Sequence, residues 1–140
     1  MKTTSSFRTD SRRLTAAAWL AGALVAPAVI AAAPADLLDQ LTARAGAPPV
    51  PERGERLFTT RQQRGWSCAS CHGAPPTRAG RHAATGKAIA PLAPSANAAR
   101  FTDAAKAEKW FRRNCSDVLG RECTAAEKAD VLSWLLTLEP

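Results

Sequence analysis

Methionine and tyrosine are nearly absent from this chain: of 140 residues none is Tyr, and the single Met is residue 1. A mature form that loses its N-terminus therefore contains no methionine, and no thioether side chain is left to bind a metal. Histidine is scarce as well, with His72 and His82 alone. This scarcity limits the ligands that a metal centre of the mature chain can use.

The chain is short, and it contains no low-complexity segment and no block of like charges. The length allows one small domain and excludes a multidomain enzyme. Ten Pro and eight Gly are too few for a fibrous chain. The formal net charge is +7, but no run of five like charges occurs, so the basic bias does not indicate a nucleic-acid partner.

Charged residues are absent from positions 14–35, directly after a start with four basic residues and one acid. The uncharged stretch is rich in Ala and ends in a small-x-small pattern at residues 33–35. A basic start, an apolar middle and a small-residue exit are typical of a secretory signal peptide. We therefore expect residues 1–35 to be removed on export to the periplasm, which leaves residues 36–140 with a net charge of +4.

Two other interpretations of the N-terminus stay open. The 22 uncharged residues are long enough to span a bilayer as a retained anchor, although Pro27 interrupts them and Ala dominates over Leu. Ser11-Arg12-Arg13-Leu14 weakly resembles a twin-arginine signal. An exported chain lies in a compartment where disulfides persist.

Helical periodicity and helix caps run through the rest of the chain. The spacing predicts helices over residues 36–45 and 51–63, a third that opens at Thr102-Asp103, and a fourth after the capping box Thr124-x-x-Glu127. Residues 73–100 are rich in Pro and Gly and predict one long irregular loop, which a cofactor would organise. No run of alternating β-branched residues predicts a strand, so the fold class is all-α.

Cys68-Ala-Ser-Cys71-His72 is the attachment sequence for a c-type haem. Each Cys sulfur bonds to one vinyl group of the porphyrin, and the adjacent His is the proximal ligand of the iron. A thioredoxin-like pair would need a βαβ setting, and a zinc site would need further paired ligands; the sequence supplies neither. We predict one covalently attached haem c in a cytochrome c domain over residues 51–140, preceded by an N-terminal helix and linker at 36–50.

The other two cysteines, Cys115 and Cys123, lie eight residues apart. In an oxidising compartment a disulfide between them is the plainest interpretation. Such a bond would hold the backbone of the neighbouring Asn114 in place.

The missing methionine leaves the sixth iron ligand open, because small electron-transfer cytochromes c usually place Met opposite His. Asn114 extends the apolar face of Ala107, Trp110 and Phe111, where an amide is costly without a partner. It is either an iron ligand or the C-cap of its helix. An open sixth position is another possibility. The remaining candidates lie in the loop or off the apolar face: His82, Lys87, Asn97, Lys106 and Lys109.

A set of short motifs extends along the chain from the helix at 51–63 to the last cysteine. They are Gly54-x-x-x-Phe58, Cys68-Ala-Ser-Cys71-His72, Thr85-Gly-Lys-x-Ile-Ala-Pro-Leu-Ala-Pro-Ser95, Arg100-Phe-Thr-Asp103, Trp110, Arg113-Asn-Cys115 and Gly120-Arg-x-Cys-Thr124. Together they resemble the sphaeroides haem protein group of small monohaem class I cytochromes c, over essentially the whole mature chain.

This resemblance implies that Asn114, beside a Cys115–Cys123 disulfide, is the sixth ligand of oxidised iron and leaves it on reduction. A neutral amide oxygen is a hard donor that prefers ferric iron. The vacated position would then accept O₂ or NO. Trp110 and Phe111 would line the pocket beside it.

Other residues receive structural or docking roles from the same comparison. Trp66 would pack on the porphyrin, and His82 lies in a stretch without a family motif, which weakens it as a ligand. Lys87, Arg112 and Arg113 would either steer an acidic redox partner or belong to an ordinary solvated surface. The partners that the resemblance implies are a dihaem cytochrome c and a membrane cytochrome b.

Helix packing is the last feature that the resemblance predicts. Gly54 and Phe58 would cross the final helix as the terminal helices of class I cytochromes do, with Gly permitting the close approach. The final helix is expected to bury Val131, Trp134, Leu135 and Leu138.

The function that follows is electron transfer combined with binding of a diatomic ligand, by a monomer, rather than enzymatic turnover. One alternative is a plain electron carrier with permanent ligation by His82 or a lysine. Another is a haem oxidoreductase that acts on its bound ligand.

Overall fold

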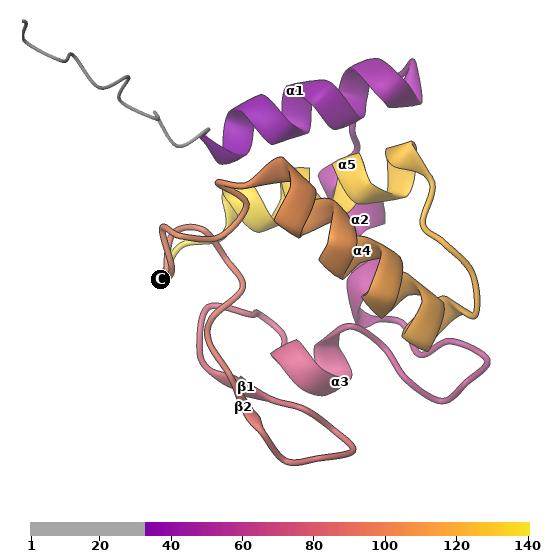
Figure 1. Cartoon of the computed structure of the whole chain (residues 1–140), viewed down its shortest axis with the longest axis vertical. Coiled ribbons are helices and arrows are strands. Elements are labelled where there is room, and N and C mark those ends of the chain that lie inside the picture. Colours follow the sequence, from indigo (N-terminus) through magenta and orange to yellow (C-terminus); the bar gives the residue numbers. More distant parts are fainter. Residues whose placement is uncertain (1–32) are drawn as a thin grey trace, which may run out of the picture.

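The computed structural model describes residues 33–140, and the predicted signal peptide lies outside them except for its last three residues (Figure 1). The fold is mostly helical, which confirms the predicted class. None of the helices in this range is both long and apolar enough to cross a membrane. The elements are α1 (Pro34–Ala45), α2 (Pro51–Thr59), α3 (Ala69–His72), β1 (Gly80–Arg81), β2 (Ala88–Ile89), α4 (Ala104–Leu119) and α5 (Ala125–Thr137).

Helices α2 and α5 cross in close contact at Gly54. A Cβ on Gly54 would lie 2.1 Å from the carbonyl oxygen of Asp130, so only glycine fits there. One turn further on, the rings of Phe58 and Trp134 pack with centroids 5.0 Å apart. Phe58 forms a buried cluster with three residues of α5, and Leu138 is only partly buried against it. The predicted helix crossing is confirmed.

A second buried cluster joins α1 to α5 and α4. Leu37 and Leu41, one turn apart on α1, pack against Ala129 and Leu132 of α5 and Ala107 of α4. Helix α5 is therefore buried on two sides, and α1 is part of the same core. In Figure 1, α1 lies at one end of the molecule, while α3 and the β-hairpin lie at the other.

Two buried charged residues of α5, Asp130 and Lys128, form ion pairs that sequence analysis did not predict. The side chain of Asp130 is 5% exposed and accepts hydrogen bonds from Arg53 Nε at 2.7 Å and from the Val50 amide at 2.6 Å. Lys128 is buried and pairs with Glu108 of α4. A buried carboxylate or ammonium needs such partners, because its desolvation is costly.

Helix α2 is shorter than predicted, since it ends at Thr59 rather than at residue 63. Thr60 has an extended backbone, with φ −72° and ψ 129°. The hydroxyl of Thr59 donates to the Glu55 carbonyl, a local bond of the kind that competes with helix continuation. Two consecutive β-branched residues lower helix propensity, and this was the missed stop signal.

The expectation of no strand is wrong, because residues 80–89 form a small antiparallel hairpin. Gly80 pairs with Ile89, and Arg81 with Ala88. The turn is closed by backbone bonds, from His82 N to the Lys87 oxygen and from Gly86 N to the His82 oxygen, each 2.8 Å. Such short pairing needs no run of β-branched residues, so alternation gave no signal.

The rest of the loop is held by its own backbone. Buried Pro76 accepts hydrogen bonds from the amides of Leu92 and Ala93, at 3.0 and 3.1 Å. Leu92 packs against the cluster around Phe58. Residues 90–93 are thereby fixed next to the segment that follows α3.

Candidate functional site

The haem-attachment motif, residues 68–72, forms a single helical turn. Cys68 caps α3, and its carbonyl accepts from the His72 amide at 3.1 Å. The Ser67 amide donates to the Ser70 hydroxyl at 2.9 Å, which ties the start of the turn to its middle. Residues three and four apart share a helix face, so this turn brings Cys68, Cys71 and His72 together.

The hairpin lies directly against this turn, and Gly80 makes the approach possible. A Cβ on Gly80 would lie 2.1 Å from the Cys71 oxygen and 2.9 Å from the His72 Cα. The Ala83 amide donates to Cys71 Sγ at 3.3 Å. Strand β1 therefore braces the motif from one side.

Neither motif cysteine takes part in a disulfide, so both sulfurs are available for attachment. Burial raises the pKa of Cys68 to about 11, so this thiol is protonated at neutral pH. Redox-active and zinc-binding cysteines have lowered pKa values instead. Among residues 33–140, no three His, Cys, Asp or Glu side chains group as a metal-ion site would need.

The His72 imidazole is half-buried beside the Phe58 ring, with centroids 6.2 Å apart. Burial, and then the positive charge of Arg100, lower the pKa of His72 to about 4. The imidazole is therefore neutral across the physiological range. Only a neutral imidazole has a free nitrogen lone pair to offer a metal.

Asn114 lies inside α4, which continues for five more residues to Leu119. The C-cap of this helix is Gly120, whose φ of 73° is left-handed. The interpretation of Asn114 as a C-cap is therefore wrong. The residue is half-buried, and within residues 33–140 its side-chain amide makes no hydrogen bond and is open to solvent.

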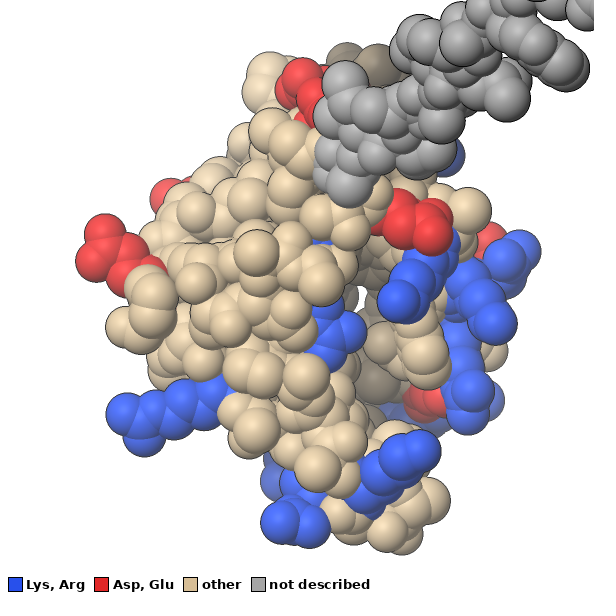
Figure 2. Space-filling model, turned by 60° about the vertical axis from the view of Figure 1, so that its left-hand side comes forward, with Lys and Arg blue, Asp and Glu red and all other residues tan. Residues whose placement is uncertain are grey.

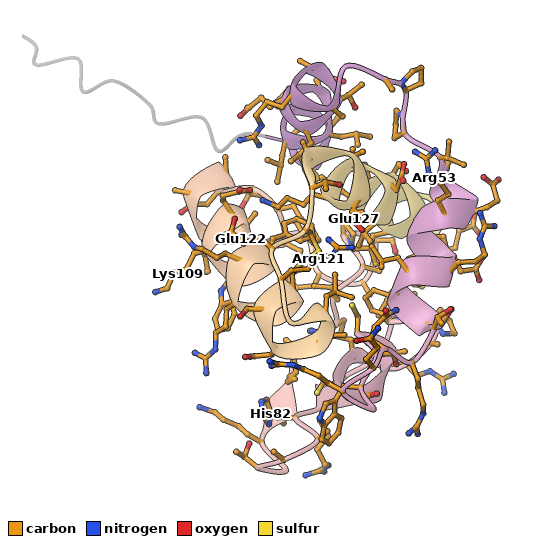
Figure 3. The ribbon with its side chains drawn as sticks, turned by 90° about the vertical axis from the view of Figure 1, so that its right-hand side faces the viewer. Arg53, His82, Lys109, Arg121, Glu122 and Glu127 are labelled. Carbon is orange, nitrogen blue, oxygen red and sulfur yellow. A yellow bond between two sulfur atoms is a disulfide. The ribbon has the colours of Figure 1, made fainter. Side chains whose placement is uncertain are left out.

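Each competing loop candidate uses at least one polar atom in a local hydrogen bond. The Asn97 amide donates to the Pro91 oxygen at 3.3 Å and accepts from the Ala99 amide at 3.2 Å. His82 lies exposed on the hairpin (Figure 3), where its Nδ1 accepts from the Thr85 amide at 3.2 Å. Neither side chain is free to turn elsewhere without breaking these bonds.

The three lysine candidates point to solvent. Lys87 is exposed on the hairpin, and Lys106 and Lys109 are exposed on α4. Figure 3 shows Lys109 directed away from the body of the protein. An exposed ammonium would have to leave water and lose a proton to bind a metal, which disfavours all three.

A disulfide joins Cys115 of α4 to Cys123, with their Cα atoms 5.6 Å apart. Cys115 is buried, and it directly follows Asn114. The bond closes the loop between α4 and α5. It thereby fixes the backbone of α4 at the position next to Asn114.

An ion pair between Arg121 and Glu127 ties the same loop to the first turn of α5. Arg121 donates to both carboxylate oxygens of Glu127, at 2.8 and 2.7 Å, and Figure 3 shows the two side chains facing each other. Glu127 also completes the capping box of α5 with Thr124, as predicted. The Arg121 guanidinium, chiefly through its hydrogen bond, lowers the pKa of Glu127 to about 2.

The aromatic residues around the motif divide into packed and exposed ones. Phe111 of α4 packs against the cluster around Phe58, as Cys68 does. Trp66 is 42% exposed and Trp110 is 46% exposed, and the Arg113 guanidinium lies 5.8 Å from the Trp110 ring centroid. The porphyrin contacts proposed for these tryptophans stay predictions.

Arg100 is a site residue that sequence analysis named only as part of a motif. Its guanidinium is half-buried and donates to the Pro91 and Ala90 carbonyl oxygens at 2.8 and 2.6 Å. Its charge acts on His72. Every residue type has a backbone carbonyl, so no sequence pattern could reveal these contacts.

Basic residues gather around the motif end of the molecule. Between positions 61 and 113 the chain has ten Lys and Arg against two acids, and one of these, Glu108, is paired with Lys128. Figure 2 shows Lys and Arg side chains on both sides of a hollow and over the lower half of that face. The site therefore lies in a positive field.

The Cys68-x-x-Cys71-His72 motif on one helical turn, braced by the hairpin and packed on a helical core, defines a small c-type cytochrome. A family model described as a domain of unknown function (DUF1924) matches residues 44–135. The cytochrome c-type protein SHP of Cereibacter sphaeroides is 52% identical over 121 residues, which cover 83% of this chain and 93% of that protein. The chain belongs to the SHP family of cytochromes c, and this membership implies a covalently attached haem.

Solved structures agree with this assignment. Oxidised SHP, described as an oxygen-binding cytochrome c, matches with a TM-score of 0.72 at 53% identity, over 76% of this chain and 98% of that one. Oxidised cytochrome c'' of Methylophilus methylotrophus matches with a TM-score of 0.68 at 35% identity, over 76% and 95%. A solution structure of the same cytochrome c'', described as giving insight into haem-ligand detachment, has a TM-score of 0.64 at 36% identity.

Proposed function

We propose that this chain is a periplasmic monohaem cytochrome c that transfers electrons and binds O₂ or NO at a site that Asn114 occupies only in the oxidised state. The observation that carries the proposal is the Asn114 amide, half-buried inside α4 and without a hydrogen bond among the described residues. Its polar atoms reach solvent, since no buried side-chain nitrogen or oxygen among residues 33–140 lacks a hydrogen bond, so the amide is available to bind a ligand.

The residues of the motif would hold one haem. Cys68 and Cys71 would form the thioethers, since they lie on one helical turn and neither forms a disulfide. His72 would be the proximal ligand, because burial keeps its imidazole neutral. When bound, the group would supply one-electron exchange and a place for a small ligand.

Asn114 would act as a gate because an amide oxygen is a neutral, hard donor. Such a donor binds ferric iron better than ferrous iron, which has one positive charge less. The Cys115–Cys123 disulfide holds the backbone beside it, so the exchange requires only a movement of the side chain. Trp110 and Phe111, four and three residues before it on α4, would line the vacated position.

Oxygen is the ligand for which a relative gives support, since SHP is described as oxygen-binding. Nitric oxide is proposed on chemical grounds, because it is a second small π-accepting diatomic. The ligand-detachment description of cytochrome c'' supports a sixth position that opens.

Electron delivery would use the basic surface around the motif. Lys87, Arg112 and Arg113 are exposed, and the segment 61–113 has a strong excess of positive charge. A positive surface steers an acidic partner into encounter. A dihaem cytochrome c and a membrane cytochrome b remain the partners that we propose.

Export would remove residues 1–35 as a signal peptide, leaving the segment 36–50 in front of a haem domain at 51–140. Helix α1 begins at Pro34, and the Ala33 amide donates to Asp36 at 2.8 Å. Cleavage near Ala35 would therefore shorten the first turn only. Leu37 and Leu41, which anchor α1 in the core, would be kept.

Optical spectra of the ferric and ferrous protein with and without CO, compared with Asn114→Ala, test the proposal. We expect a ferrous wild type that responds at once to CO and NO, and a ferric spectrum that changes in the variant. An unresponsive low-spin ferrous spectrum would favour permanent ligation by His82 or a lysine instead. Steady consumption of O₂ or NO with an electron donor would favour the oxidoreductase alternative. Gln63→Ala, which removes an exposed amide outside the proposed site, is the matched control.

A further inference from the structure

Phe101, which lies just before α4, has a backbone conformation that a bulky residue rarely adopts. Its φ is 61°, and within the range 33–140 it is the one non-glycine residue with a positive φ. In this left-handed region the Cβ of an L-residue is crowded, and glycine alone avoids the cost. Such strain persists only where the surrounding structure imposes it, and it concentrates at functional sites.

The side chain of Phe101 joins the two buried clusters of the core. It packs against the cluster that contains Leu37 and Leu41 and also against the cluster around Phe58. No other residue in the described part of the chain belongs to both. Cys68 of the haem-attachment motif packs against the second cluster as well. The ring is therefore held between the helical core and the motif.

The chain is fixed on both sides of Phe101. Before it, the Arg100 guanidinium donates to the Pro91 and Ala90 carbonyl oxygens at 2.8 and 2.6 Å. After it, the side chain of Asp103 caps the first turn of α4. These bonds leave the backbone little freedom to relax, so the ring and the start of α4 keep a fixed relation.

The same ring contacts α4 one turn before Asn114. The centroids of the Phe101 and Phe111 rings lie 6.2 Å apart, within the range of attractive aromatic pairs. Phe111 and Asn114 are three residues apart on α4 and share a helix face. On the other side of Asn114, the disulfide holds Cys115. Helix α4 is thus held on both sides of Asn114, by an aromatic contact and by a covalent bond.

We propose that Phe101 is a positioning residue that sets where α4 holds the amide of Asn114. The inference rests on the proposed function, to which it adds the residue that determines how firmly the gate closes. The left-handed backbone directs the ring toward Phe111. Without the ring, α4 is free to shift, and the Asn114 amide reaches its position less well, because a ligand must be held closely to its productive geometry.

Imidazole titration of the purified ferric holoprotein tests this inference, because imidazole must displace Asn114 in order to bind. We expect Phe101→Ala and Phe101→Gly to bind imidazole about tenfold more tightly than the wild type does. Phe101→Gly accepts the left-handed backbone, so it removes the ring without the strain that alanine keeps. Phe101→Leu retains the apolar bulk and should stay within about twofold of the wild type.

A double-mutant cycle with Asn114→Ala separates positioning from a direct effect of the ring. Once Asn114 is removed, Phe101→Ala should not change the affinity for imidazole any further. An equal effect in both backgrounds, or an unchanged affinity in both variants without the ring, would overturn the inference. Failure of both of these variants to bind haem would overturn it too, since the role of Phe101 is then structural.

Leu38→Ala is the matched control, because this side chain packs from α1 against the cluster of Leu37 and Leu41. Its stability in urea should fall while its affinity for imidazole equals that of the wild type. The same gain in affinity there would count against Phe101, since any loss of core packing would then produce it. If Asn114→Ala alone leaves the affinity unchanged, the proposed function fails, and that result needs no Phe101 variant.

Discussion

Gly54 of α2 lies against the backbone of Asp130 in α5, where a Cβ would be 2.1 Å from the carbonyl oxygen. The contact brings Phe58, one turn later, onto Trp134 and places the same ring 6.2 Å from His72. Close helix approach at one end of α2 thus determines what packs beside the proposed haem ligand. A change at Gly54 should be felt both in stability and at the site.

We expect Gly54→Ala to lower the free energy of unfolding by roughly 1–3 kcal/mol, because the added methyl group forces the two helices apart. Urea unfolding of the holoprotein measures this change. Glu55→Ala, at an exposed position of the same helix, is the control and should stay within about 0.5 kcal/mol. A Gly54→Ala protein as stable as the wild type would show that the helices separate without cost.

The Arg121–Glu127 pair predicts a specific pH dependence. The pKa of Glu127 falls from 4.5 to about 2 on folding, so the folded state binds fewer protons than the unfolded one in this range. The resulting stability is present above about pH 4.5 and disappears as the pH falls toward about 2. Arg121 is half exposed, so solvent screens the pair and limits its contribution to about 0.5–1 kcal/mol.

Glu127→Gln isolates this contribution, since glutamine can still complete the capping box. The difference in unfolding free energy between wild type and variant is measured at about pH 6 and about pH 3. It should shrink at the lower pH. A difference that stays constant would mean that the carboxylate does not titrate in this window.

Removal of the disulfide should destabilise the protein and loosen the region around Asn114. Cys115 and Cys123 are eight residues apart, and a loop of that size is worth about 2.5 kcal/mol in chain entropy. We expect this loss in the Cys115→Ala/Cys123→Ala double variant, measured by urea unfolding of the oxidised holoprotein. Its ferric spectrum reports whether the amide still reaches its proposed position.

The matched comparison is the Cys115→Ser/Cys123→Ser double variant, which opens the same bond with a different replacement and leaves the iron oxidised. Both samples should lose similar stability. Equal stability of all three proteins would contradict a restraining role for the bond. A loss of stability with an unchanged ferric spectrum would place the effect in the loop and not at Asn114.

Features that depend on neighbours in the chain could be predicted from the sequence alone. Cys68, Cys71 and His72 lie within one helical turn, so their suitability for haem attachment follows from local geometry. The capping box at Thr124 and Glu127 is equally local. Composition by itself also excludes methionine as an iron ligand. The only methionine is residue 1, and it is lost if the N-terminal segment is cleaved.

Tertiary structure decided the points that depend on distant segments. Only the length of α4 removed the C-cap interpretation of Asn114, and only the loop contacts occupied the amide of Asn97. The partners of Asp130 and Arg100 come from segments remote in the chain or from backbone carbonyls, which carry no residue-specific signal. The periodicity of a sequence indicates which face of a helix or strand is apolar. Packing determines which groups meet across different elements, because desolvated charges and amides must find partners there.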